Sequence, residues 1–161
     1  MIEKREKKAE PETPIRLLEE QIADELKIEE AQLRKELKNQ PSRFFQWARL
    51  WARASIVKKM SWLRLEETEA RISREFRRRM AGEESKPRVT EKTINEFVVS
   101  DPSYIEAREA YFKAEYKENI LAAARDAFQQ RHQSLSELYK GQSEEKLLNA
   151  GVAAIKQNLG L

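Results

Sequence analysis

The chain has 161 residues, of which 37% are charged and 40% are hydrophobic, and its formal net charge is +3. It contains no cysteine and one histidine, which excludes disulfides, thiolate nucleophiles, cysteine-ligated zinc and a histidine metal cluster. With only four glycines, this composition is typical of long helices whose apolar faces are covered by partner chains.

Residues 1–12 are mostly charged and predict a disordered arm. The charged start has no apolar core of the kind that a secretory signal needs. No apolar run approaches the roughly 18 residues of a membrane-spanning helix. We therefore expect a cytoplasmic protein with no membrane partner.

Two short helical segments are expected before Pro41. Thr13 followed by Pro14 is a favourable helix start, with a capping hydroxyl and proline in the first turn. Pro41 disfavours helix at Gln40, so we expect a boundary there, with Ser42 capping the next helix. The apolar residues keep helical spacing at Ile15, Leu18, Ile22 and Leu26, and then at Ile28, Leu33 and Leu37. This N-terminal part is expected to form a helical hairpin on the helix that follows.

Residues 42–80 predict one long basic helix, because no glycine or proline interrupts them. They hold all three tryptophans, and between Pro41 and Gly82 eleven basic residues stand against four acidic ones, a net charge of +7. At about 100° per residue, one stripe of this helix is apolar. The apolar stripe comprises Phe44, Trp47, Trp51, Ala54, Trp62, Leu65, Ile72, Phe76 and Met80. A nearly opposite stripe comprises Arg49, Arg53, Arg64, Arg71, Arg74 and Arg78.

Residues 81–89 predict a loop, because Gly82 stops the helix and Pro87 lies beyond it. Thr90 is expected to cap a short helix that contains Ile94.

A second long helix is expected over residues 103–140, starting at Pro102 and ended by Gly141. Its apolar residues recur every seven positions, which indicates coiled-coil packing against another long helix. The repeat comprises Ala107, Ala114, Leu121, Phe128 and Leu135. A companion row of Ala110, Ala124 and Leu138 is interrupted by Lys117 and Arg131.

Residues 142–161 predict a separate apolar helix, which a neighbouring subunit would cover. We expect residues 13–141 to form one helical domain. The predicted fold is all-α, an elongated long-helix hairpin or bundle with coiled-coil-like packing, completed by homo-oligomerisation. The residues assigned to oligomerisation are Leu121, Phe128, Leu135, Leu148, Val152 and Ile155.

No motif for catalysis is present: the chain has no glycine-rich phosphate loop, no metalloprotease motif and no nucleophile elbow. Its glutamates are typical of solvated helix faces, and His132 lies in a polar stretch that indicates a surface position. We expect no catalytic residue, no metal, no cofactor and no enzymatic activity.

The basic residues of the central helix predict a nucleic-acid surface, because arginine pairs bidentately with phosphate and clustered like charges favour a bound anion. The predicted contacts are Arg49, Arg53, Lys58, Lys59, Arg64, Arg71, Arg74, Arg77, Arg78 and Arg79. The alternative is a solvated face balanced by glutamates from elsewhere. The tryptophans could stack on bases, but their place on the apolar stripe favours packing.

Three segments resemble the phage recombination mediator family typified by UvsY. They are the acidic and apolar EEQIADELKIEEAQLRKELKNQP, the basic KKMSWLRLEETEARISREFRRRMAG, and the helical DPSYIEAREAYFKAEYKENILAAARDAFQQRHQSL. The resemblance covers roughly residues 15–140.

The resemblance implies a protein that binds single-stranded DNA non-specifically, forms closed homo-oligomeric rings, and acts in phage-infected bacterial cells. It also implies that the protein helps to load a RecA-like recombinase onto strands covered by single-strand-binding protein. The family's DNA-contacting pair of basic residues falls at about Arg74 and Phe76. Phe76 departs from that pattern, and Arg71, Arg77 or Arg78 would take its place.

Another class of function fits the same helical pattern. A structural coiled-coil scaffold or assembly chaperone would share the seven-residue repeat, and its arginines would pair with glutamates across helices. An adaptor that binds a partner through the apolar tail is a third alternative.

Overall fold

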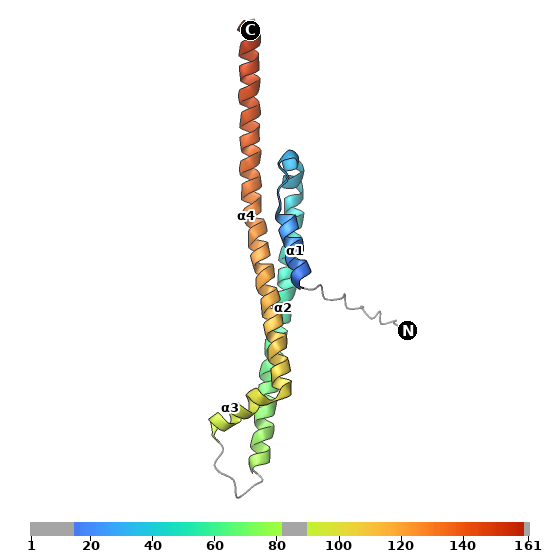
Figure 1. The fold of residues 1–161 in the computed structure, drawn as a ribbon, viewed down its shortest axis with the longest axis vertical. Helices are drawn as coiled ribbons and strands as arrows, with labels where there is room; N and C mark the ends of the chain where they lie inside the picture. The colour runs from blue at the N-terminus through green and yellow to red at the C-terminus, as the bar shows by residue number, and fades with distance from the viewer. Residues whose placement is uncertain (1–14, 82–89, 160–161) are drawn as a thin grey trace, which may run out of the picture.

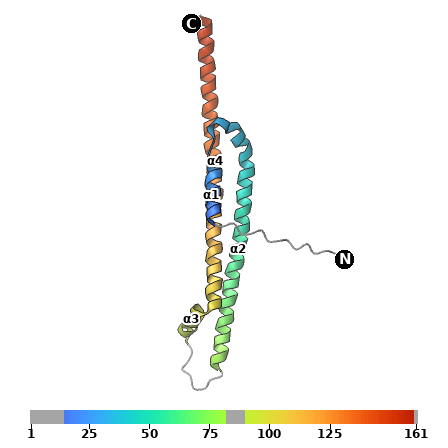
Figure 2. The ribbon, with the colours of Figure 1, turned by 45° about the vertical axis from the view of Figure 1, so that its right-hand side comes forward.

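The computed structural model describes residues 15–81 and 90–159, and every element in these two ranges is helical (Figure 1). The elements are α1 (Ile15–Leu26), the short 3₁₀ helix η1 (Glu30–Gln32), α2 (Leu33–Ala81), α3 (Glu91–Ser100) and α4 (Pro102–Leu159). Helices α2 and α4 run antiparallel and side by side, and α1 packs along them (Figures 1 and 2). The prediction of an elongated all-α hairpin is confirmed.

The boundary predicted at Pro41 is wrong, because α2 begins at Leu33 and includes both Pro41 and Ser42. A proline inside a helix removes one backbone hydrogen bond and costs about 3 kcal/mol. Tertiary contacts on both sides of the proline offset that cost. Before it, the buried Gln40 side chain donates a hydrogen bond of 2.5 Å from Nε2 to the carbonyl oxygen of Phe128 in α4, and after it the buried Trp47 stacks on the Phe128 ring.

The predicted starts of the two later helices are confirmed. Thr90 caps α3, since its side-chain oxygen accepts a hydrogen bond of 3.3 Å from the backbone N–H of Thr93. Helix α4 begins at Pro102, and the Asp101 carboxylate accepts a 2.8 Å hydrogen bond from the backbone N–H of Ser103. The predicted arm, the predicted start at Thr13, and residues 82–89 lie outside the described residues.

The predicted end of the second long helix at Gly141 is wrong. Helix α4 continues through Gly141 and Gly151 to Leu159, so residues 142–159 belong to α4 and form no separate helix. Glycine permits a helix to end in left-handed backbone but does not require it, and inside a helix it costs about 1 kcal/mol relative to alanine. Neither glycine is crowded by a neighbouring side chain that would redirect the backbone.

The main core joins α1, α2 and α4. The rings of Trp47 and Phe128 stack at its centre, with centroids 5.7 Å apart. Leu18 of α1 closes this core from one side. A second, smaller core forms where Ile72 of α2 meets Ile94 and Val98 of α3.

The seven-residue repeat of α4 is buried within the chain. Coiled-coil-like packing is therefore correct, but the covering surface comes from the same chain, chiefly α2. Leu121, Phe128 and Leu135, assigned to oligomerisation, are each exposed by 2% or less and belong to this intramolecular packing. They offer no surface to a second chain, so their assignment is corrected.

Candidate nucleic-acid interface

Nine of the ten predicted basic residues are exposed on α2, and the tenth, Lys58, is partly buried beside α4. They line one helix because α2 is uninterrupted from Leu33 to Ala81. From Arg49 to Arg78 the helix rises about 44 Å, at 1.5 Å per residue. The basic surface is therefore a long ridge.

Six of these basic side chains form no ion pair with the residues that the structure describes. We call these six the open basic row: Arg49, Arg53, Lys59, Arg64, Arg74 and Arg78. The Nε of Arg74 donates to the carbonyl oxygen of Ala70 at 3.2 Å, which leaves the rest of its guanidinium available.

Arg71, Arg77 and Arg79 are balanced by carboxylates. The guanidinium of Arg79 lies 3.1 Å from one Glu75 oxygen, and that of Arg71 lies 3.8 Å from the other. Arg77 contacts both oxygens of Glu91 in α3, at 2.9 and 3.2 Å. All of these groups are at least half exposed, so each ion pair is weak, but a phosphate would have to displace a carboxylate to reach these arginines.

Lys58 has a different role, because it faces α4. Its Nζ lies 3.4 Å from Glu115 and 3.5 Å from Glu118. Partial burial acts to lower the pKa of Lys58, but the hydrogen bond to Glu115 and the charges of both carboxylates outweigh burial and raise that pKa. The positive charge of Lys58 is therefore already balanced by carboxylates of the same chain, and its ion pairs join α2 to α4.

Two of the three tryptophans pack within the chain and not among the basic residues of α2. Trp47 is fully buried and donates a 3.0 Å hydrogen bond to Glu25. Trp51 donates to Glu118 at 2.9 Å and lies under the guanidinium of Arg125, 4.2 Å from the ring centre. Both tryptophans therefore pack within the chain, as their place on the apolar stripe predicts. Trp62 is 46% exposed, so the packing expected from its place on the apolar stripe is wrong.

Large apolar side chains lie beside the open basic row, a feature that the sequence reading missed. Phe45 is 67% exposed and lies one turn before Arg49. Ile56, Met60 and Leu63 are exposed farther along α2. Their helical spacing from Phe45 can be read from the sequence. That spacing does not show whether another helix of the chain covers them. A nucleic acid could use them for base contact, and a second protein could use them for packing.

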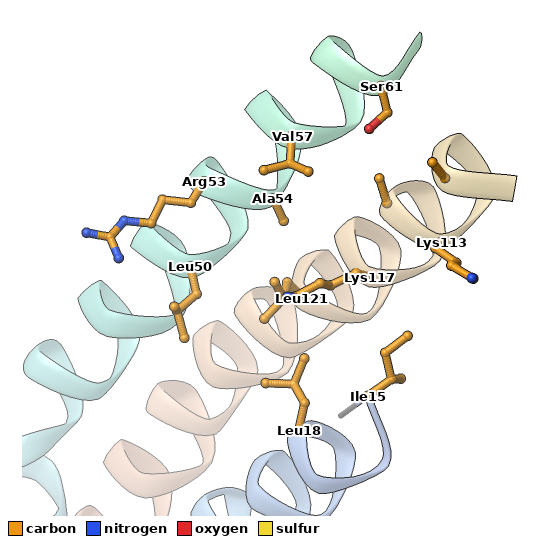
Figure 3. A pocket seen from close by; sticks show the side chains of 12 residues that line it. Ile15, Leu18, Leu50, Arg53, Ala54, Val57, Ser61, Lys113, Lys117 and Leu121 are labelled. Carbon is orange, nitrogen blue, oxygen red and sulfur yellow. The ribbon is translucent and has the colours of Figure 1, made fainter. Parts of the chain in front are cut away.

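A cleft of about 660 Å³ lies where α1 stops covering the groove between α2 and α4 (Figure 3). Its walls include Ile15, Leu18 and Leu121, which are apolar. Arg53 reaches the edge, and in Figure 3 its guanidinium extends away from the apolar side chains. Arg53 therefore belongs to the outer basic surface.

A buried polar cluster stabilises the opposite end of the core. Arg131 donates to the carboxylate of Glu36 at 2.5 Å and to the Gln40 side-chain oxygen at 2.6 Å. It also donates to the carbonyl oxygens of Leu26 and Lys27, at 3.2 and 2.9 Å, which are left without helical partners where α1 ends. Arg131 interrupts an apolar row in the sequence because it caps α1.

The residues assigned to oligomerisation at the C-terminal end are in a different situation from those in the core. Leu148, Val152 and Ile155 are 51–70% exposed on the last part of α4. No described helix covers them.

Comparison of the chain with protein-family models, with curated proteins and with solved structures gave no match. Within residues 15–81 and 90–159, no helix is long and apolar enough to cross a membrane.

Proposed function

We propose that this protein binds single-stranded DNA non-specifically through the outer face of α2 and acts as a recombination mediator. The observation that carries the DNA-binding part is the open basic row. Six cations without ion pairs in the described chain are held on one rigid helix over about 44 Å. Such a ridge can follow a phosphate backbone without reading bases.

The physical basis of binding would be counterion release. For single strands, each phosphate contact contributes about 0.7 to the slope of log affinity against log salt. Arginine suits this purpose because its planar fork holds two phosphate oxygens at once. Phe45, one turn from Arg49, adds an exposed ring on which an unpaired base can stack. Nothing in the described helices resembles a module that reads base edges.

The mediator role rests on the resemblance to the UvsY-like family. In this proposal the partners are a RecA-like recombinase and single-strand-binding protein, and the chain acts as a homo-oligomer. The mediator role is tested by measuring whether the protein accelerates recombinase loading on oligo-dT that is covered by single-strand-binding protein. An unchanged loading rate, with DNA binding intact, would remove the mediator role and leave a DNA-binding protein.

A structural scaffold is the second candidate, and a specific observation favours it. Ile56, Met60 and Leu63 are exposed beside the basic row, and three of the arginines already pair with glutamates of the same chain. A second helix could cover this face and pair with the remaining arginines. Such a complex would prefer protein to nucleic acid.

The deciding experiment is fluorescence anisotropy of labelled oligo-dT over a salt series, with duplex DNA as competitor. If the protein binds single-stranded DNA as proposed, its affinity for oligo-dT should fall steeply as salt is added. Duplex DNA should not displace the oligo-dT. Replacing Arg74 and Arg78 together by alanine should flatten the salt slope by about 1.4. The matched control replaces Arg77 and Arg79, which lose the same charge but are ion-paired. If the two double variants have equal effects, net charge alone accounts for the binding. If the unmodified protein does not bind oligo-dT, the scaffold function is favoured.

A further inference from the structure

The last part of α4 extends beyond every other described helix (Figures 1 and 2). Where it leaves the rest of the molecule, Gln142 donates a 3.3 Å hydrogen bond from Nε2 to the carbonyl oxygen of Glu30. From residue 144 to residue 157 every residue is exposed. We call residues 143–159 the projecting segment, and at 1.5 Å per residue it is about 25 Å long.

A helix of this kind needs a partner. Most of the stability of a helix in a protein comes from tertiary packing of its apolar face, which this segment lacks within the described chain, and Gly151 weakens it further. Its apolar side chains are also poorly suited to solvent, since Leu148 is 70% exposed and Ile155 is 59% exposed. The described part of the chain leaves them uncovered, and a second molecule can supply the covering surface.

The spacing of these residues matches a two-stranded coiled coil. Steps of four and three residues connect Gly141, Glu145, Leu148, Val152, Ile155 and, in the sequence, Leu159. This alternation keeps one narrow stripe facing a partner helix. Leu147 is as exposed as Leu148, at 73%, but it lies outside the stripe. We propose that the projecting segments of two copies pair as an antiparallel coiled coil.

Charge complementarity selects both the partner and the direction. Glu145 is the one charged residue of the stripe, and Lys156 flanks the stripe at its other end. In a parallel pair in register, each Glu145 would meet the same residue of the second copy, which is unfavourable near an apolar seam. In the antiparallel pair, each Glu145 lies beside Lys156 of the second copy. A second copy therefore supplies the matching charge, twice.

The antiparallel register is self-consistent along the whole segment. Leu148 opposes Val152 of the second copy, and Glu145 opposes Ile155. The two-fold axis then passes close to Ala150, and the interface is isologous and closes as a dimer. This pairing goes beyond the proposed function and involves the end of the molecule opposite the C-terminal end of α2 (Figure 1), the part of α2 that carries Arg74 and Arg78. If the projecting segments did not pair, DNA binding by α2 would be unaffected. If α2 did not bind DNA, the pairing would be unaffected.

Single introduced cysteines test the direction cleanly, because the chain has no cysteine of its own. Asn149 and Glu144 are both exposed and both flank the stripe, but only Asn149 is near the two-fold axis. Disulfides need Cα atoms close together, so Asn149→Cys should form a covalent dimer at least about tenfold faster than Glu144→Cys under mild oxidation. If Asn149→Cys cross-links no faster than Glu144→Cys, antiparallel pairing is overturned.

Sedimentation of the full chain tests the contacts. Leu148→Ser should lower the dimer fraction, whereas Leu147→Ser, outside the stripe, should leave it unchanged. Glu145→Lys and Lys156→Glu should each weaken the dimer alone, and an equimolar mixture should restore it, since both ion pairs are then re-formed with reversed sign. A Leu148→Ser protein that sediments as the unmodified protein does, or a mixture that recovers nothing, would overturn the proposal.

Discussion

Arg131 of α4 and Glu36 of α2 form an ion pair of 2.5 Å that is almost entirely removed from solvent. The pair lies where α1, α2 and α4 meet, and the same guanidinium also binds the free carbonyl groups at the end of α1. Arg43 contacts the same Glu36 oxygen from the solvent side, at 2.9 Å. One arginine thus connects three helices that are far apart in the sequence.

Replacing Arg131 by methionine should destabilise the fold by about 3–5 kcal/mol, because it leaves the buried Glu36 carboxylate without its partner. Thermal unfolding followed by circular dichroism measures this loss. The control is Arg34→Met, at an exposed position of α2, which should change stability by less than about 0.5 kcal/mol. Equal stability of the two variants would show that the cluster contributes little.

Stability should fall in acid, and Glu36 should account for part of the loss. Burial acts to raise the pKa of Glu36, but the hydrogen bond from Arg131 and the charges of Arg43 and Arg131 outweigh it and lower that pKa below its ordinary 4.5. A lowered folded-state pKa contributes stability above pH 4.5, which is lost as the pH falls through the folded value. Glu36→Gln should therefore be less stable at neutral pH and lose less on acidification. An unchanged acid slope in this variant contradicts the assignment.

Glu75→Gln should strengthen binding to single-stranded DNA, because it frees Arg71 and Arg79 from their shared carboxylate. The salt slope in the anisotropy assay should steepen by up to about 1.4, for two added phosphate contacts. Glu69→Gln changes the net charge equally but lies at an exposed position with no ion pair in the described chain, and it serves as the reference. If both variants gain the same affinity, the pairing with Glu75 does not regulate the basic surface.

Leu121→Ala should destabilise the folded chain by about 2–5 kcal/mol, because Leu121 is buried between α1, α2 and α4. The exposed Leu147→Ala provides the comparison and should be within about 0.5 kcal/mol of the parent chain. Urea unfolding of the two variants measures the difference. A Leu121 variant that unfolds normally but loses only its oligomeric state would restore this residue to an intermolecular interface.

Local features of the sequence determined much of the helical layout. Thr90 and the Asp101–Pro102 step mark helix starts through capping and a preset backbone angle, and both effects act within a few residues. The seven-residue repeat and the arginine stripe likewise follow from helical periodicity alone. An elongated all-α fold and an exposed basic face on α2 were therefore predictable.

Tertiary structure decided what periodicity leaves open. A repeat shows which face is buried but not which helix covers it, so Leu121, Phe128 and Leu135 were assigned to another chain although α2 helps to cover them. Contacts between distant segments carried α2 through Pro41, because Gln40 gained a partner 88 residues away. The same kind of contact gave Arg131 its buried role and paired Arg77 with Glu91. Each depends on which helices meet in space, and residue spacing within one helix does not specify that.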